Sequence, residues 1–466
     1  MTAVDVVIMA AGKGTRMKSR LPKVLHRLGG RALVDHVVAR ARQLQARRIV
    51  LVTGHGAAQV EEAVSALERG DGQAVPAFVR QEPQLGTGHA VQQALPQLPD
   101  DGIALILNGD VPLIEAATLQ ALVDSCAGQR LALLTVEMPD PTGYGRILRS
   151  GDAVRAIVEH KDADEAQRGI REVYSGFMAV PNALLKRWLA RLTNDNAQGE
   201  YYLTDIVRLA VDDGAEVVAV RTADKLQVDG VNSPQQLADL ERAFQLRQAR
   251  ALMEQGVRLA DPARFDLRGT LDCGQDVEID VNCVFEGKVR LGEGVRIGPN
   301  CVIANADIGA GAVLHAFTHV EGESAGVRVG EGALVGPFAR LRPGADLGPE
   351  VHIGNFVEVK NASLARGAKA NHLAYLGDAT VGERVNYGAG SITANYDGAN
   401  KHRTVIEDDV HIGSNSVLVA PVTIGRGGTV GGGSVISKDT PANALSVARA
   451  KQVSIANWQR PKKQPK

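Results

Sequence analysis

The chain has few cysteines, few aromatic residues, almost no net charge and no long hydrophobic run. Its four cysteines include no CxxC pair, which argues against a zinc site and against a disulfide framework. A net charge of −1 gives no general attraction to nucleic acid or to a membrane, so we expect neither as a partner. Nothing resembles a transmembrane span, and the first residues are too short and too acidic for a signal peptide. We therefore expect a cytoplasmic protein.

Aliphatic residues recur at every sixth position through long stretches of the second half, over residues 279–303, 329–359 and 406–436. A period of six fits neither an amphipathic helix nor a two-sided strand. It is the hexapeptide signature of a parallel β-helix, in which three flanks of six residues close one coil. An aromatic content of 4% and 51 glycines suit such coils, because small residues let the chain turn corners. The alternative, a Gly-rich antiparallel sheet, would not keep this phase.

Two cysteines and two interruptions stand out within this repeat. Cys283 and Cys301 are separated by the length of one full coil, so we expect them to stack. The spacing permits a disulfide, but a reducing compartment favours free thiols. The six-residue phase breaks at residues 363–380 and 393–404, and we expect each break to be a loop that leaves the coil. Loops on repeat scaffolds commonly carry function.

The first half alternates strand-like and helical segments. The strand-like segments are residues 4–10, 48–53, 103–107, 131–136 and 216–220. This alternation predicts a doubly wound, Rossmann-like α/β domain with its ligands at the carboxyl ends of the strands.

Three polar motifs lie where such ligands would bind. Residues 11–17 form a Gly-rich loop with a lysine and an arginine directly after the first strand, which suits a phosphate chain, although a plain tight turn has the same spacing. Residues 108–110, Asn-Gly-Asp, offer a carboxylate suited to Mg²⁺. Gln81 and the Gly-Thr-Gly of residues 86–88 could approach a planar base. Taken singly, the last two motifs are more often turns than sites.

A single helix joins the two halves. Ser233 can cap it, Pro234 occupies its first turn, Gln236 follows three residues after the cap, and Gly256 can end it. For a chain of 466 residues, the division predicts a first domain at 1–230, a rigid linker helix at 231–251 and a β-helix domain at 252–466.

Several motifs together resemble a specific family. Residues 10–17, 21–25, 86–88, 142–146, 157–159, 201–205 and 230–232, together with Gln81, resemble sugar-1-phosphate nucleotidyltransferases. Residues 371–378 and 394–398 resemble hexapeptide acetyltransferase motifs. Over nearly its whole length the chain resembles the bacterial bifunctional N-acetylglucosamine-1-phosphate uridyltransferases/glucosamine-1-phosphate acetyltransferases. The resemblance implies a left-handed β-helix and a homotrimer.

For the first half, the resemblance implies Mg²⁺-dependent uridyl transfer from UTP to N-acetylglucosamine-1-phosphate. Arg16 and Lys13 would hold the triphosphate, and Lys23 would neutralise charge at the reacting centre. Asp110 and Asn232 would hold Mg²⁺. The residues implied in UTP or UDP-sugar binding are Ala10, Gly12, Lys13, Lys23, Gln81, Gly86, Thr87, Asp110, Gly145, Glu159 and Asn232.

Two positions depart from the family pattern in this half. Asn108 stands where the family often has an aromatic residue, and Tyr174 stands where an asparagine contacts the sugar. We therefore carry no sugar-binding role onto Tyr174.

For the second half, the resemblance implies acetyl transfer from acetyl-CoA to glucosamine-1-phosphate. His372 would be the general base, since an imidazole titrates near neutrality. Asn395 would either orient His372 or stabilise the oxyanion. Arg342, Lys360, Tyr375 and Asn386 would bind the sugar phosphate, and Asn395, Tyr396, Ser414, Gly432 and Arg449 would bind acetyl-CoA.

Two other classes of protein compete with this interpretation. One is a single-activity sugar-1-phosphate nucleotidyltransferase whose β-helix is regulatory or oligomerising; His372 and residues 395–396 argue against it. The other is a non-catalytic β-helix protein, which the loop at residues 11–17 and Lys23 disfavour.

Overall fold

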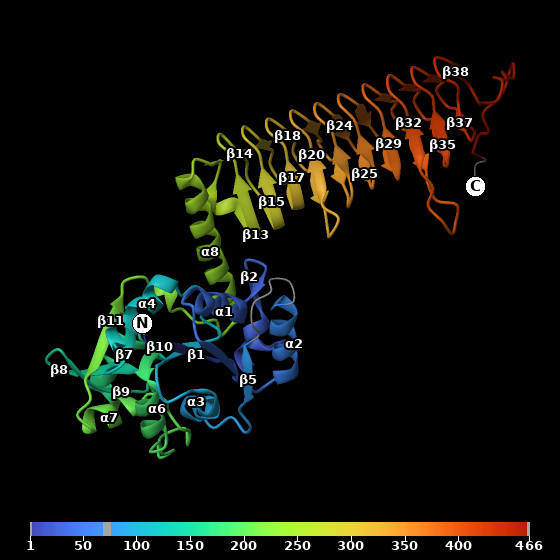
Figure 1. The fold of residues 1–466 in the computed structure, drawn as a ribbon. Coiled ribbons are helices and arrows are strands. Elements are labelled where there is room, and N and C mark those ends of the chain that lie inside the picture. The colour runs from blue at the N-terminus through green and yellow to red at the C-terminus, as the bar shows by residue number, and fades with distance from the viewer. Residues whose placement is uncertain (1, 69–75, 464–466) are drawn as a thin grey trace. The chain divides into compact units, whose positions relative to one another are not determined.

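The computed structural model describes residues 2–68 and 76–463. Its contacts divide the chain into two units, Met1–Phe244 and Gln245–Lys466, which Figure 1 shows as an α/β part and a column of coils. The division lies inside helix α8 (Pro234–Glu254), which begins and ends three residues later than the linker expected at 231–251. None of the described helices is long and apolar enough to cross a membrane.

A mixed sheet forms the centre of unit 1. Among the described residues its main path runs β11 (Val217–Thr222), β7 (Leu131–Glu137), β10 (Glu172–Pro181), β6 (Ile103–Asn108), β1 (Val4–Met9), β4 (Arg48–Thr53) and β5 (Ala77–Arg80). The five predicted strands are all present. The pattern of apolar residues did not reveal that β10 runs antiparallel to its neighbours, or that β8 (Arg146–Ser150) and β9 (Ala153–Val158) form a hairpin beside it.

Helices cover both faces of this sheet. Val6 and Ile8 of β1 enter one apolar core, whereas Val7 between them enters the other, as alternation along a strand requires. The first core is covered by α1 (Leu33–Gln43), α2 (Ala57–Glu68) and α4 (Ala116–Cys126), and the second by α3 (Thr87–Ala94), α6 (Asn182–Leu189) and α7 (Asp205–Asp212). The short elements are α5 (Glu165–Arg168), β2 (Arg27–Leu28) and β3 (Arg31–Ala32). The doubly wound prediction is therefore confirmed.

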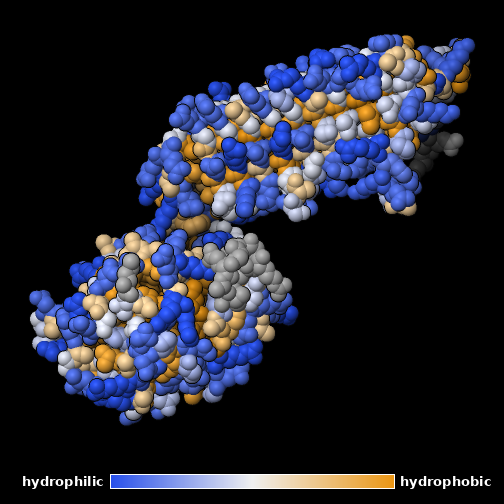
Figure 2. Space-filling model, in the orientation of Figure 1, coloured by the Kyte–Doolittle hydropathy of each residue, from blue (hydrophilic) through white to orange (hydrophobic). Residues whose placement is uncertain are grey.

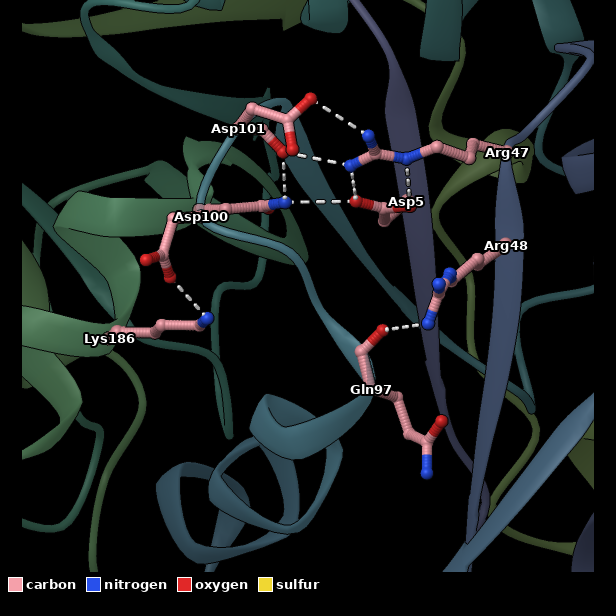
Figure 3. A network of polar contacts seen from close by, with 8 residues as sticks. Asp5, Arg47, Arg48, Gln97, Asp100, Asp101 and Lys186 are labelled. Carbon is pink, nitrogen blue, oxygen red and sulfur yellow. Dashed lines mark hydrogen bonds and ion pairs between the residues drawn. The ribbon is translucent and has the colours of Figure 1, made fainter.

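A buried carboxylate ties the start of β1 to its surroundings (Figure 3). Asp5 is fully buried and accepts hydrogen bonds of 2.6 and 3.0 Å from the Arg47 guanidinium. Asn182 at the start of α6 donates to it at 2.8 Å, and Arg47 also donates to Asp101 at 2.9 Å. A buried charge is tolerated only when it is paired and hydrogen-bonded, so this network fixes the amino-terminal edge of the sheet, opposite the predicted ligand edge.

The cap at Ser233 and the stop at Gly256 that the sequence predicts for helix α8 are both present. The Ser233 hydroxyl accepts from the Gln236 backbone N–H at 3.2 Å, and the Gln236 side chain accepts from Asn232 at 2.8 Å. At the other end Gly256 has φ +97°. The N–H of Gly256 donates to Met253 and that of Val257 to Leu252, each at 3.0 Å, which is a Schellman motif.

Unit 2 is a parallel β-helix, as predicted, and its described residues form two long sheets. One contains β12 (Arg258–Leu259), β14 (Glu278–Ile279), β16 (Arg296–Ile297), β18 (Val313–Leu314), β21 (Leu334–Val335), β24 (His352–Asn355), β27 (Lys369–His372), β30 (Asn386–Tyr387), β33 (His411–Ile412), β36 (Thr429–Val430) and β38 (Leu445–Ser446). The other contains β13 (Phe265–Cys273), β15 (Cys283–Leu291), β17 (Val302–Ile308), β19 (His319–Glu321), β20 (Val327–Val329), β22 (Arg340–Leu341), β23 (Asp346–Leu347), β25 (Glu358–Lys360), β26 (Ser363–Leu364), β28 (Tyr375–Gly377), β29 (Ala379–Val381), β31 (Ile392–Ala394), β32 (Thr404–Ile406), β34 (Val417–Val419), β35 (Val422–Ile424) and β37 (Val435–Ile436). Leu341, Leu347 and Ile353, which recur at every sixth position, are at most 1% exposed. The residues with the six-residue period therefore form the core of the β-helix.

One of the two predicted loops is wrong. Through residues 363–380 the strands stay paired, with Asp346 beside Ser363 and Glu358 beside Tyr375. Two successive coils, each one residue shorter than usual, shift the six-residue phase while the chain stays in the stack of coils. The second break is a loop: Thr380 pairs with Val405, and Tyr396 and Lys401 form an antiparallel bridge inside it.

The structure also shows a loop that the period did not reveal. Asp307 pairs with Arg328, further along the chain than one regular coil reaches, and Gly322 to Gly326 lie in this excursion. Gly326 has φ +72° and donates to the Gly322 carbonyl at 2.8 Å. Two glycines closing a short turn are its signal in the sequence.

The cysteines behave as expected. Val284 pairs with Val302, which stacks the preceding Cys283 and Cys301 on neighbouring coils. Both are buried free thiols that donate to backbone carbonyls at 3.2 Å. Burial raises the pKa of Cys283 to about 12 and that of Cys301 to about 11, so neither thiol is reactive.

Candidate active sites

The Gly-rich loop of unit 1 follows directly on β1. The Ala10 N–H still donates to Val52 at 2.8 Å, after which the chain leaves the sheet. Gly14 has φ +59°, and a Cβ there would lie 2.7 Å from the Cβ of Lys23, so this turn requires glycine. At Gly12 a Cβ would meet no atom of the described residues within 4 Å. The loop therefore presents backbone to open space, as a phosphate-binding loop must.

Most of the predicted nucleotide-binding residues line one cavity of about 590 Å³. This volume suits a nucleotide-sized ligand. Its lining includes Ala10, Gly12, Lys13, Arg16, Lys23, Gln81, Gly86, Thr87, Asp110 and Asn232. These residues come from the carboxyl ends of β1 and β6, the start of α3 and the segment before α8, so the sheet topology brings distant motifs together.

Three of these residues meet at one point. The Lys23 ammonium donates to the Asp110 carboxylate at 2.5 Å and to the Asn232 amide oxygen at 3.2 Å. One carboxylate and one amide oxygen aimed at the same place are a donor set that suits Mg²⁺, which takes few protein ligands and completes its shell with water and phosphate. Among the described residues no group of three or more His, Cys, Asp and Glu side chains could hold a metal ion.

The predicted base-reading loop is held by its own hydrogen bonds. Gln81 donates to the Gly86 carbonyl at 2.9 Å, and the Thr87 hydroxyl accepts from the Leu203 N–H at 3.0 Å. Gly86 has φ +103°, and a Cβ there would lie 2.6 Å from the Tyr201 carbonyl. The segment around Tyr201 therefore supports this loop, a role that the spacing of motifs did not predict.

Gly145 and Glu159 lie together but are not part of the cavity lining. A Cβ on Gly145 would be 3.6 Å from a Glu159 carboxylate oxygen. That carboxylate accepts from the Thr204 hydroxyl at 3.0 Å, and burial raises the pKa of Glu159. Because Leu203 donates to Thr87, Glu159 is joined through one short segment to a residue of the cavity. Thr204 was not among the predicted site residues.

In unit 2 the ring of His372 has a partner that the sequence did not indicate. Its Nδ1 lies 2.9 Å from the amide oxygen of Asn355, and the two residues are paired across β24 and β27. An amide oxygen only accepts, so Nδ1 carries the proton and Nε2 is left as the basic atom. His372 itself is exposed and available to a substrate.

A cluster of cations lies on the neighbouring sheet. Arg342 donates to Val359 through its backbone, which sets it beside Lys360 on the next coil. Repulsion from Arg342, and then contact with Lys401, lowers the pKa of Lys360. Glu358 offsets part of this charge by accepting from Arg342 at 2.8 Å. The cations Arg342, Lys360 and Lys401, gathered in this way, favour an anion such as a phosphate.

Tyr375 lies flat against its own strand beside these cations. A Cβ on Gly377 would be 2.2 Å from the Tyr375 hydroxyl, so this arrangement requires glycine at position 377.

Asn395 is engaged within the coil stack. Its amide donates to the Asp378 carboxylate, which also accepts from Asn361 at 2.5 Å. In the described chain the partner of the His372 ring is thus Asn355 and not Asn395. Tyr396, next in the loop, is 62% exposed.

The remaining predicted residues continue a row that starts at His372. Gly390 donates to the His372 carbonyl, and Gly433 donates to the Ser414 carbonyl at 2.8 Å. With the Asn415 N–H, which donates to the Ala389 carbonyl at 2.8 Å, these bonds set His372, Ala389, Ser414 and Gly432 at the same corner of four successive coils. Arg449 donates to the Gly432 carbonyl at 2.5 Å. Asn386 lies on the flat face instead, paired with Lys369 and His411.

Family models of known proteins match segments of both units. Residues 6–177 match the MobA-like NTP transferase domain, and residues 273–305 and 403–438 match the bacterial transferase hexapeptide repeats. Among solved structures, a UDP-glucose pyrophosphorylase complexed with UDP-glucose is 16% identical, with a TM-score of 0.44 over 52% of this chain and 98% of that chain.

Curated relatives match over the full length. The bifunctional protein GlmU of Paracidovorax citrulli is 74% identical over 476 residues, covering 100% of both chains. That of Polaromonas sp. is 73% identical over 99% of both chains, and that of Azoarcus sp. is 58% identical over 99% of this chain and 100% of its own. The chain therefore belongs to the GlmU family of bifunctional proteins.

Proposed function

We propose that this chain makes UDP-N-acetylglucosamine in two steps on its two units. Unit 2 transfers acetyl from acetyl-CoA to the amine of glucosamine-1-phosphate. Unit 1 then transfers uridylate from UTP to the N-acetylglucosamine-1-phosphate produced, releasing pyrophosphate. The chain is thus an enzyme with a nucleotidyltransferase and an acyltransferase activity, and we place it in the cytoplasm.

In uridyl transfer, a phosphate oxygen of the sugar attacks the α-phosphorus of UTP and pyrophosphate leaves. Such chemistry needs positioning and neutralisation of charge, and no covalent intermediate. Lys13 and Arg16 on the Gly-rich loop hold the triphosphate. Lys23 neutralises charge at the reacting phosphates. Gln81 and the backbone at Gly86 read the base.

The site also has a place for Mg²⁺. Asp110 and Asn232 would hold the ion. When bound, Mg²⁺ offsets negative charge on the triphosphate. Lys23 donates to both of these residues, so it keeps the two oxygens together and lies beside them when the triphosphate arrives.

In acetyl transfer, the substrate amine attacks the thioester carbonyl carbon and the thiol of coenzyme A leaves. His372 Nε2 takes a proton from the amine, and Asn355 keeps the ring in the tautomer that leaves Nε2 free. Arg342 and Lys360, with Lys401, bind the sugar phosphate. Ser414, Gly432 and Arg449 mark the path of the coenzyme along the coils. Because Asn355 and not Asn395 contacts the His372 ring, we keep for Asn395 the other predicted role, stabilisation of the oxyanion, beside binding of acetyl-CoA.

The convergence of the predicted nucleotide-binding residues on one cavity is the observation that carries the proposal. The test incubates the pure protein with glucosamine-1-phosphate, acetyl-CoA, UTP and Mg²⁺ and identifies the products by mass. We expect UDP-N-acetylglucosamine, pyrophosphate and free coenzyme A. Formation of a UDP-sugar only when acetylated substrate is supplied would instead support the single-activity alternative.

We also propose that the chain assembles into a homotrimer through its β-helix. Phe317, Phe338 and Phe356 stack with ring centroids 4.9 and 5.4 Å apart, yet they are 47–56% exposed. All three have φ between 55° and 60°, a region that phenylalanine rarely adopts. Figure 2 shows hydrophobic side chains along the visible face of the β-helix. A strained, exposed aromatic row that ends beside His372 favours a contact between copies of this chain.

Replacing Phe356 with aspartate should therefore separate the copies, because it places a charge within the apolar row. We expect light scattering to show a smaller particle, acetyl transfer to fall with it, and uridyl transfer to continue. Val453→Asp, at a residue 82% exposed in the tail, is the matched control and should stay assembled. A Phe356→Asp protein of unchanged mass would refute this interface.

A further inference from the structure

Tyr174 in unit 1 carries a buried hydroxyl with no hydrogen-bond partner among residues 2–68 and 76–463. The residue lies on β10 and is 8% exposed. Buried tyrosine hydroxyls normally find a partner, and an unpaired one costs stability. An orphaned polar group that persists at such a cost often serves function.

The surroundings of this hydroxyl connect it to Glu159. The Tyr174 N–H donates to the Gly145 carbonyl at 2.8 Å, and Gly145 lies against the Glu159 carboxylate. The Tyr174 ring packs in the same apolar core as Ile147 and Ile157 of the β8–β9 hairpin. After burial, the charge of Glu159 is the next cause of the raised pKa of Tyr174. Ring, hydroxyl and carboxylate therefore share one neighbourhood.

Glu159 needs a donor of this kind. The Thr204 hydroxyl donates to it, and most of the charged groups near it disfavour its ionised form. Burial is the main reason that its pKa is raised; Asp162 and Asp205 raise it further, and Arg146 opposes them. Glu159 also faces Tyr202, whose pKa it helps to raise. A carboxyl group in this setting accepts strong, charge-assisted hydrogen bonds from a sugar only while it is ionised.

We propose that Tyr174 is a positioning residue of the uridyl-transfer site, whose hydroxyl donates to Glu159 when the sugar phosphate binds and holds that carboxylate ionised and directed at the sugar. The proposal rests on the uridyl-transfer function assigned above. It gives Tyr174 no contact with the sugar, because the hydroxyl is buried. The specificity of this site for its sugar then depends on a pair of residues, Tyr174 and Glu159.

Loss of the Tyr174 hydroxyl should impair uridyl transfer at low pH but should not lower the stability of the folded protein. A donor to the ionised form lowers the pKa of a carboxyl group, so loss of the hydroxyl raises the pKa of Glu159 further. Because the hydroxyl is unpaired in the free protein and donates only in the sugar complex, the acid limb of kcat moves to higher pH, whereas that of kcat/KM, which reports the free enzyme, stays in place. The folded protein loses only an unpaired buried polar group, so its thermal midpoint is unchanged or higher.

The test compares Tyr174→Phe with the unaltered full-length chain in uridyl transfer. We expect KM for N-acetylglucosamine-1-phosphate to rise about ten- to a hundredfold, the range for a lost hydrogen bond to a charged group. KM for UTP and the rate of acetyl transfer should not change. Tyr387→Phe removes another buried hydroxyl, which lies 3.5 Å from the Tyr375 carbonyl in unit 2, and should leave uridyl transfer unaltered.

A second variant separates positioning from structure. In a Glu159→Gln background, Tyr174→Phe should cause no further loss and no shift of the acid limb, because the two side chains act as a pair. Full additivity of the two losses would overturn the proposal, as would wild-type kinetics in Tyr174→Phe alone. A lower thermal midpoint with KM for both substrates raised would make Tyr174 structural and also overturn it. Absence of uridyl transfer in the unaltered chain would instead refute the proposed function.

Discussion

Asp110→Asn should lower uridyl transfer by about a hundredfold or more and leave acetyl transfer at its normal rate. Removal of this charge takes away the carboxylate that faces Lys23 and Asn232 in the nucleotide cavity. Charge on the triphosphate is then offset less well in the transition state, and interactions of this kind contribute several kcal/mol. Acetyl transfer breaks no phosphate bond, so it has no need of this carboxylate.

Two further measurements make this result specific. Asp124→Asn removes one exposed carboxylate from helix α4 in the same unit and should leave both activities unchanged. Titration with Mg²⁺ should show that Asp110→Asn binds UTP less tightly than the unaltered chain when the ion is present, and equally when it is absent. Parallel loss of both activities would show that Asp110 is structural.

The architecture could be predicted because two periods in the sequence each impose a geometry. A residue at every sixth position, such as Leu341 and Leu347, has to enter one narrow core, and only stacked coils satisfy this. Alternating strand and helix segments likewise dictate a sheet covered on both faces. The ends of α8 were predictable as well, because Ser233, Pro234 and Gly256 each satisfy a local backbone requirement.

Features that depend on pairing between distant residues could not be predicted. Whether β10 runs parallel or antiparallel is decided by the path of the connection, and both directions bury the same residues. The shift of phase at residues 363–380 looks in sequence like a loop, yet a coil shorter by one residue keeps Asp346 beside Ser363. Register is a sum of coil lengths, so a single miscounted residue alters every later contact.

The same limit explains which site residues were missed. Asn355 lies beside His372 only because the coil that connects them is short by one residue, and no spacing rule marks it as a partner. Thr204 reaches Glu159 because α7 packs against β9, which is a tertiary contact. Residues such as Lys13, Lys23 and Asp110 were found because each belongs to a local motif at the end of a strand.

His372→Ala should lower the rate of acetyl transfer by about 10² to 10⁴-fold, the usual contribution of a general base. The side chain is exposed and lies outside the apolar core, so coil packing and assembly should be preserved. The loss should appear in turnover at saturating acetyl-CoA, measured by release of free thiol, with uridyl transfer normal. His319→Ala, which removes a histidine from β19 elsewhere on the β-helix, is the matched control and should retain full activity.

The hydrogen bond from His372 to Asn355 makes this test sharper. Asn355→Ala keeps the base but removes the acceptor that holds its proton on Nδ1, so a fraction of the rings will carry the proton on Nε2 and be inactive. We expect a loss of only about two- to fivefold, far smaller than that of His372→Ala, since tautomers of a free imidazole differ little in energy. In the double variant Asn355→Ala should add nothing, because its effect passes through the missing ring. If a correctly assembled His372→Ala protein transferred acetyl at the wild-type rate, His372 would be an ordinary surface residue. If adding Asn355→Ala to His372→Ala lowered the rate further, Asn355 would have a role of its own toward the substrate.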